Sequence, residues 1–228
     1  MRALALGLPG IAAVVLLVAP PPGIPAIALA VNPTVLLCVA AFVGPFAAER
    51  LGLRSAILMS DTVSLRSLIR AFGLGAGLGL GLSGIDCVTA SIWQGPASDL
   101  PALCEQASLG GFVLGLLYGG VTEELITRWG LLSILALGLS KMMPIQWSVG
   151  LAVILSAVVF ALAHLPALWL AIPDPTIAVL IRTLALNTVA GLAFGAVFLS
   201  AGLEAAMLAH IAFHCAVFTS RFIIGPFI

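Results

Sequence analysis

Apolar segments about as long as a membrane crossing follow one another along the chain, with only short polar stretches between them. They cover residues 4–19, 24–47, 68–93, 109–139, 145–171, 176–200 and 203–224. A helix needs about 20 predominantly apolar residues to cross a bilayer. The sequence therefore predicts an all-α fold, a polytopic transmembrane helical bundle of about seven spans. We expect residues 1–228 to form a single membrane-embedded domain.

Composition supports this class and excludes others. The chain is 62% hydrophobic and only 8% charged, which is typical of a membrane protein. A formal net charge of zero leaves no basic surface for nucleic acid. The four cysteines contain no CxxC pair, which excludes a zinc finger or a thioredoxin-type site. The lipid bilayer is therefore an expected partner, and nucleic acid is not.

The basic residues predict an orientation. Arg2, the arginines within 49–70 and Lys141 fall on one side of an alternating bundle, while loops 94–108 and 172–175 contain no basic residue. Arg182 and Arg221 lie toward that other side. The positive-inside rule then places the N-terminus in the cytoplasm and the C-terminus outside.

The first apolar segment has a second interpretation. Residues 28–30 resemble a signal-peptide cleavage site. The proline run at 20–22 lies well before that site, and apolar character resumes directly after it. We therefore favour a retained helix over a cleaved signal peptide.

Ionisable residues interrupt the fourth apolar segment. Each such group inside a membrane costs about 2.5–3.5 kcal/mol, so it is rarely without a role. Glu124 and Arg128 are four residues apart and can pair on one helix face. Glu123 lies about 100° round the helix from Glu124, on the same face as Gly119 and Gly120. These small residues leave room for another group to approach Glu123. The pattern predicts one paired carboxylate and one free carboxylate.

All three histidines of the chain fall within predicted spans. His210 and His214 are one helical turn apart and share a face. His164 closes the sequence Phe-Ala-Leu-Ala-His that begins at Phe160. The sixth segment adds Asn187, followed at spacings of four by two glycines that form a small-residue groove.

These motifs resemble, in order and spacing, those of the CPBP family, intramembrane proteases related to the CAAX prenyl endopeptidases and also called the Abi family. Glu123-Glu124-x-x-x-Arg128, Phe160-x-x-x-His164 and a final His210-x-x-x-polar carry the resemblance, which covers roughly residues 109–216. It implies a glutamate-type endopeptidase with its catalytic core in that range, and no cofactor. The implied substrate is a peptide or a membrane protein. The implied location is a bacterial inner (cytoplasmic) membrane.

The resemblance also implies roles for single residues. Glu123 and His164 would activate a water, with the glutamate as general base. His210 and His214 would stabilise the oxyanion. We expect the remaining members to support the site, namely Glu124, Arg128, Phe160 and Asn187.

One departure from the family leaves alternatives open. The family usually has Asn where this chain has His214, and an imidazole can bind metal as well as donate a hydrogen bond. A zinc-dependent protease that uses Glu123, His164 and His210 with His214 is therefore the alternative mechanism. Glu/His chains also serve as proton relays, so a proton-coupled transporter or channel remains open. A catalytically silent binding or immunity scaffold is the third class. In the plainest interpretation, the charges and histidines only hold helices together.

Several polar residues outside these motifs have ordinary interpretations. We expect Asp86 to be solvated or to cap a helix near the end of the third segment, and Glu204 to cap the seventh. Residues 60–62, Ser-Asp-Thr, are expected to cap an interfacial helix within 49–70. The glycines between 73 and 81 predict close helix packing. Cys87 and Cys104 fall toward the same predicted side, but a bridge between them is not our favoured expectation, because sequence cannot give their separation.

Overall fold

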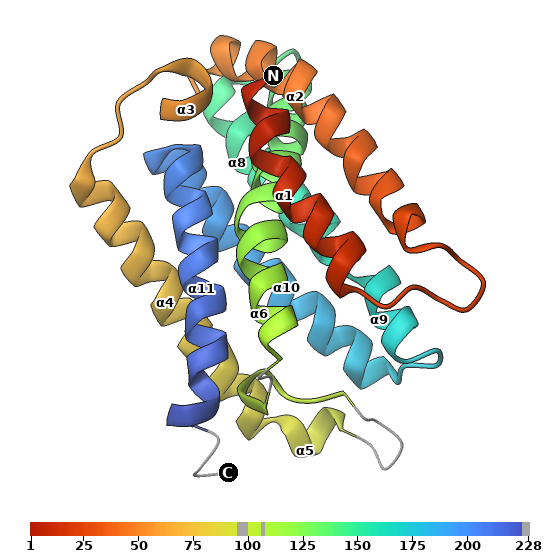
Figure 1. The fold of residues 1–228 in the computed structure, drawn as a ribbon. Helices are drawn as coiled ribbons and strands as arrows, with labels where there is room; N and C mark the ends of the chain where they lie inside the picture. The colour runs from red at the N-terminus through yellow and green to blue at the C-terminus, as the bar shows by residue number, and fades with distance from the viewer. Residues whose placement is uncertain (95–99, 106–107, 225–228) are drawn as a thin grey trace.

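The computed structural model describes residues 1–94, 100–105 and 108–224, and these residues form helices and turns without any strand (Figure 1). Part of the predicted polar loop 94–108, including Asp99, lies outside the described residues. Six helical segments within the described part are long and apolar enough to cross a membrane. They are Ala26–Leu51, Leu65–Val88, Leu109–Leu139, Ile145–Ala171, Ile177–Ala201 and Leu203–Ile223. The predicted polytopic helical bundle is confirmed.

The first predicted span is shorter than the other six. Helix α1 (Arg2–Leu17) has 16 residues. At 1.5 Å per residue it is about 24 Å long, against about 30 Å for the hydrocarbon core. It packs beside the short turn η1 (Ala26–Ala30) and helix α2 (Val31–Leu51). Its Gly7 carbonyl accepts a hydrogen bond from Thr122 Oγ1 at 2.8 Å, so α1 also packs on the middle of the bundle.

The segment between α2 and the next long helix bears on two predicted caps. The short helix α3 (Ala56–Met59) is capped by Ser55, whose Oγ accepts from Leu58 N at 3.1 Å. Asp61 follows α3, and its Oδ2 accepts from Ser55 N at 3.0 Å. Glu204 does not cap its own helix, because its Oε1 accepts from Ser55 Oγ at 2.6 Å and from Ile57 N at 2.9 Å. The prediction for residues 60–62 is met in part, because Ser60 forms the C-terminal cap of α3 in the left-handed conformation. The cap predicted for Glu204 is wrong, because its carboxylate bonds groups that only the tertiary fold brings close.

Helix α4 (Leu65–Val88) leads to α5 (Ala90–Trp93) and to the turn η2 (Leu103–Glu105). Its glycines divide into two sets. Added Cβ atoms at Gly75 and Gly79 would collide with the backbone of the last helix, whereas Gly73, Gly77 and Gly81 meet nothing within 4 Å. Close packing therefore explains only the first two.

A continuous helical path crosses the centre of the molecule. It consists of α6 (Leu109–Leu114), the π-helical segments η3 (Gly115–Glu123) and η4 (Leu125–Leu132), and α7 (Ser133–Leu139). Leu125, Trp129 and Leu132 are fully buried in the core. The sequence predicts ordinary α-helix over this stretch, and the structure differs from that prediction. π-helical turns are uncommon and occur often at functional sites, and Glu123 and Glu124 lie where the two π-helical segments meet.

The fifth predicted span is broken near its end. Helix α8 (Ile145–Leu162) stops just before His164, and α9 (Leu165–Ala171) starts with Pro166 in its first turn. Proline has no N–H and is tolerated at a helix start, so it favours a new helix at this point.

Helix α10 (Ile177–Ala201) and helix α11 (Leu203–Ile223) complete the bundle. Gly191 of α10 faces Ala157 of α8, where an added Cβ would lie 2.9 Å from the Ala157 Cα atom. Gly195 faces Val153 in the same way. The predicted small-residue groove is therefore the contact between α8 and α10.

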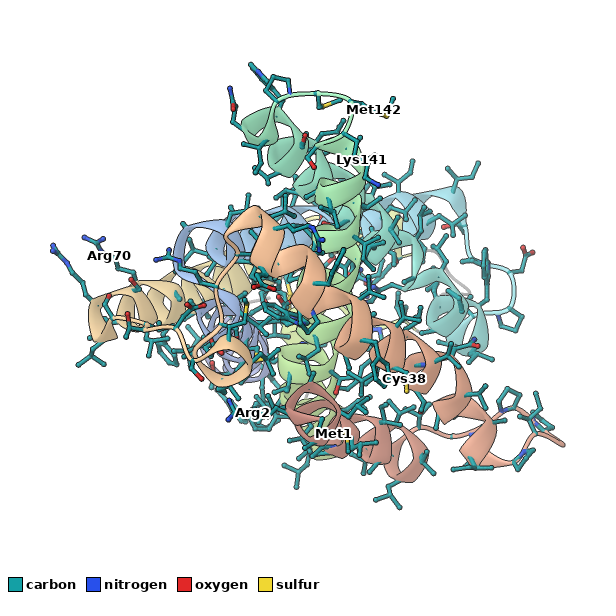
Figure 2. The ribbon with its side chains drawn as sticks, turned by 90° about the horizontal axis from the view of Figure 1, so that it is seen from above. Met1, Arg2, Cys38, Arg70, Lys141 and Met142 are labelled. Carbon is teal, nitrogen blue, oxygen red and sulfur yellow. A yellow bond between two sulfur atoms is a disulfide. The ribbon has the colours of Figure 1, made fainter. Side chains whose placement is uncertain are left out.

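Arginine side chains lie at one end of the bundle. The N-terminus and α3 lie at one end, and α5 and the end of α11 lie at the other (Figure 1). Arg2 Nη1 donates to Ile57 O at 2.9 Å, and Arg54 Nη2 donates to Ser200 O at 2.8 Å, both at the first end. Seen from that end, Arg2, Arg70 and Lys141 lie on different sides of the bundle (Figure 2).

We predict that the arginine-rich end faces the cytoplasm. In a variant with Cys38 and Cys215 replaced by serine, Thr62→Cys should be protected from an impermeant thiol reagent in intact cells. Asp174→Cys should react, because the loop that holds it has no basic residue. Labelling of Thr62→Cys with protection of Asp174→Cys would reverse the predicted orientation.

Candidate active site

A cavity of about 630 Å³ lies between η3, α9, α10 and α11, with the facing ends of α1 and α2 adding apolar wall. Most of its lining is apolar. The polar or ionisable side chains in the lining are Tyr118, Glu123, Thr127, His164, Arg182, Thr183, Asn187, His210 and His214. All four predicted catalytic residues thus border one space, together with the predicted supporting residues Phe160 and Asn187.

The two adjacent glutamates occupy different environments. Glu123 is half-buried and borders the cavity. Glu124 and Arg128 are completely buried and lie outside its lining. Arg128 Nε is 3.2 Å from Glu124 Oε2, so the predicted i,i+4 ion pair is present. The sequence therefore separated the two carboxylates correctly by their surroundings.

Glu124 makes a second contact that sequence reasoning missed. Its Oε1 accepts a hydrogen bond from His210 Nδ1 at 2.9 Å. The carboxylate thus lies between Arg128 on its own helical path and a histidine of α11. It fixes the position of a cavity residue without bordering the cavity.

His164 is oriented by the backbone at the break between α8 and α9. Its Nδ1 donates to Phe160 O at 2.8 Å, and the Phe160 ring lies edge-on with its centre 4.6 Å from the imidazole centre. In a neutral imidazole with Nδ1–H, Nε2 has a free lone pair. His164 Nε2 can therefore accept a proton or a hydrogen bond from a water in the cavity.

The His210 ring is held between two other rings. The Phe194 ring lies 4.3 Å from it on one side, at 23°, and the His214 ring lies 4.9 Å from it, at 16°. Phe194 is fully buried, and sequence reasoning did not single it out. Its spacing of seven residues from Asn187, which puts both on one face of α10, was the available signal.

Glycines of η3 allow this histidine pair to approach closely. An added Cβ at Gly115 would lie 2.6 Å from His214 Nδ1. One at Gly119 would lie 2.6 Å from His214 Nε2 and 3.5 Å from His210 Nε2. The room predicted beside Gly119 is thus occupied by the two imidazoles, and both Nε2 atoms face η3 beside the cavity.

Two further side chains complete the polar wall. Asn187 Nδ2 donates to Thr183 O of its own helix at 2.8 Å, which fixes the amide in the cavity wall. Tyr118, the one tyrosine of the chain, borders the same cavity and was passed over in the sequence.

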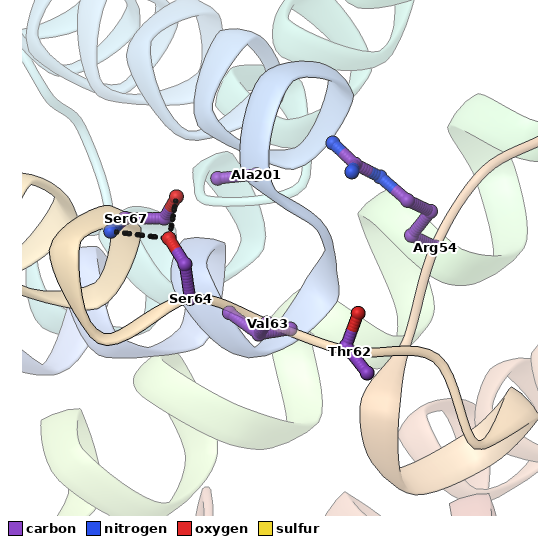
Figure 3. Close-up of a pocket in the computed structure, with 6 residues that line it drawn as sticks. All are labelled: Arg54, Thr62, Val63, Ser64, Ser67 and Ala201. Carbon is purple, nitrogen blue, oxygen red and sulfur yellow. Dashed lines mark hydrogen bonds between the residues drawn. The ribbon is translucent and has the colours of Figure 1, made fainter.

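A second cavity, of about 340 Å³, lies at the arginine-rich end (Figure 3). Its lining is Arg54, Thr62, Val63, Ser64, Ser67 and Ala201. Neither a carboxylate nor an imidazole is among these residues, so this cavity offers no general base of the kind expected for peptide hydrolysis.

Among the described residues, no group of three or more His, Cys, Asp or Glu side chains is placed to hold a metal ion. In the cavity, His164 and His210 each use Nδ1 in a hydrogen bond.

A comparison with known protein families tests the resemblance suggested by the motif spacing. Residues 105–216 match the family model described as type II CAAX prenyl endopeptidase Rce1-like. The match covers 112 of the 228 residues and agrees with the resemblance that the motifs carry. The matched range runs from the end of η2 to just beyond His214 and contains every predicted site residue. The match indicates a membrane protease of the CAAX type. Comparisons with curated proteins and with solved structures give no match.

Proposed function

We propose that this protein hydrolyses a peptide bond in the cavity, using a water activated by Glu123 and His164. The observation that carries the proposal is the convergence of Glu123, His164 and the His210–His214 pair, from separate parts of the chain, on one largely apolar cavity. The Glu123 carboxylate would take a proton from the water while the water oxygen forms a bond to the carbonyl carbon of the peptide. That proton would then pass to the leaving amine as the C–N bond breaks.

The polar lining suits these roles. Glu123 is the one carboxylate among the described lining residues, so it is the carboxylate available there to act as general base. The lone pair of His164 Nε2 can hold the water in place for attack. A largely apolar, water-poor site strengthens the attraction between hydrogen-bond donors and a developing oxyanion.

The two stacked histidines would be the oxyanion donors. His210 Nδ1 donates a hydrogen bond to Glu124. A second hydrogen bond, donated from His210 Nε2 to the oxyanion, therefore requires the doubly protonated ring. The negative charge of Glu124 can balance the positive charge of a protonated His210, although Glu124 is also paired with Arg128. His214 can carry its proton on Nε2 as a neutral ring. It is therefore the more readily available donor in the place where the family usually has Asn.

Replacements of His214 separate the donor role from a zinc-ligand role. If His214 donates to the oxyanion, His214→Asn should keep much of the activity. His214→Ala should lose about 10²–10³ in rate, the usual effect of deleting one such donor. Chelators should have no effect on the purified wild type. A dead His214→Asn, with stoichiometric zinc in the wild-type protein, would instead establish a zinc site.

The direct test of the proposed function is cleavage by the purified protein in lipid nanodiscs. A prenylated peptide ending in a CAAX sequence, suggested by the family name, and a mixed library of unmodified peptides are incubated with wild type and Glu123→Ala. Mass spectrometry should detect new peptide termini only with the wild type. If no peptide is cut and proteoliposomes show a proton flux that Glu123→Ala removes, the chain is a transporter and the proposal is wrong.

A further inference from the structure

Residues 100–105, which we call the strap, contribute Leu103 to the lining of the large cavity. Asp86, near the end of α4, holds this strap in place. The Asp86 side chain is only 1% exposed, and its Oδ2 accepts from Leu103 N at 2.8 Å. The solvated or capping role expected for Asp86 is therefore wrong, because the strap and α10 cover it.

The same carboxylate holds an arginine of α10 at two points. Arg182 Nε donates to Asp86 Oδ1 at 2.7 Å, and Arg182 Nη2 donates to Asp86 Oδ2 at 2.6 Å. The Arg182 Cζ atom lies 4.3 Å from the centre of the Trp93 ring, and Trp93 Nε1 donates to Asp86 O at 3.3 Å. A planar guanidinium held at two points and stacked on an aromatic ring has a fixed orientation.

A covalent bond joins the same two segments beside this contact. Cys87 follows Asp86, Cys104 follows Leu103, and the two cysteines form a disulfide. The sequence did not favour a bridge between Cys87 and Cys104, but the structure contains one. Both cysteines are buried, with Trp93 and Ala102, in a small apolar cluster. The strap is thus fastened to α4 by a disulfide and to Asp86 by a hydrogen bond.

Leu103 and Arg182, the two residues that Asp86 holds, both border the large cavity, whereas Asp86 does not. Arg182 is also the one Lys or Arg among the described lining residues. The hydrogen bonds of the Asp86 carboxylate within the described residues go to Leu103 and Arg182, and none goes to Glu123 or to a histidine. Its loss should therefore change the shape of the wall where substrate is held, and leave the reacting groups in place.

We propose that Asp86 is a positioning residue that sets the substrate affinity of the cavity through Arg182 and Leu103. The proposal rests on the proposed hydrolytic function. In this proposal the buried Asp86–Arg182 ion pair, which is not part of the matched motifs, determines the shape of the cavity wall. Catalysis of bond cleavage remains with Glu123 and His164.

Steady-state kinetics of Asp86→Asn tests the proposal on the peptide that the wild type cleaves best. We expect KM to rise roughly tenfold or more, as for the loss of one hydrogen bond to a charged group, with kcat within about twofold of wild type. Asp86→Glu should recover part of the affinity because it keeps the carboxylate. Asp174→Asn makes the same chemical change in an exposed loop and should leave both constants unchanged.

Two further measurements keep the result clear. Hydrogen exchange in residues 100–105 should quicken in Asp86→Asn, because the Leu103 amide loses its charged acceptor. If Asp86→Asn does not fold, Arg182→Lys, which keeps the charge without the two-point contact, should raise KM in the same direction. Unchanged KM, or an effect confined to kcat, would overturn the proposal while the proposed function stands. A wild type that cleaves no peptide would remove both.

Discussion

Glu123→Gln is expected to abolish turnover while leaving an abundant, folded protein. The substitution keeps the size of the side chain and removes only the base. General-base catalysis typically contributes about 10²–10⁴ in rate, so kcat should fall by that factor. Because Glu123 is half-buried and lines the cavity, its loss should hardly change stability. The measurement is kcat by mass spectrometry, with the thermal unfolding midpoint of the same preparation.

Glu49→Gln is the matched control, since Glu49 is exposed at the end of α2, outside the cavity. It should cleave at the wild-type rate. Turnover by Glu123→Gln close to that of Glu49→Gln would show that another group is the base.

Glu124→Gln should have the opposite profile, with its main effect on stability. Arg128 is completely buried, and Glu124 is its charged partner at 3.2 Å. Breaking a buried ion pair from one side costs about 3–5 kcal/mol, because the other charge is left uncompensated. Activity should also fall, since His210 loses its anionic acceptor. Thermal and denaturant unfolding in detergent measure the effect.

A double variant tests the cause of that loss. Glu124→Gln with Arg128→Met removes both charges and should recover part of the stability that Glu124→Gln loses. If Glu124→Gln instead proves stable and inactive while Glu123→Gln unfolds, the roles of the two glutamates are reversed.

The main site residues could be predicted because polar groups are costly in apolar spans. Glu123, Glu124 and the three histidines stand out in segments that otherwise contain almost no ionisable group, and helical spacing alone pairs Glu124 with Arg128. The same principle placed the spans within a few residues. Helix breaks were harder to place, since the fifth segment stays apolar through the turn at His164.

Contacts between distant segments could not be predicted in this way. Glu124 and His210 are 86 residues apart, and nothing in either motif tells which face of α11 meets the central helical path. The π-helical winding of the central path also changes which residues share a face, and no local residue pattern predicts that winding.

Asp86 and Arg182 illustrate the limit most clearly, because they are 96 residues apart and each was judged alone. Both residues lie toward the same predicted side of the membrane, and an ion within a span needs a partner, so the sequence contains a signal for this pairing.

Capture of intact substrate by the inactive Glu123→Gln variant tests most directly whether the cavity is where cleavage occurs. A photoreactive amino acid replaces Ala167, which borders the cavity, or Leu162, which is 47% exposed and lies outside the lining. The account predicts that uncleaved peptide is cross-linked from position 167 and not from position 162. Equal capture at both positions, or capture from position 162 alone, would contradict it.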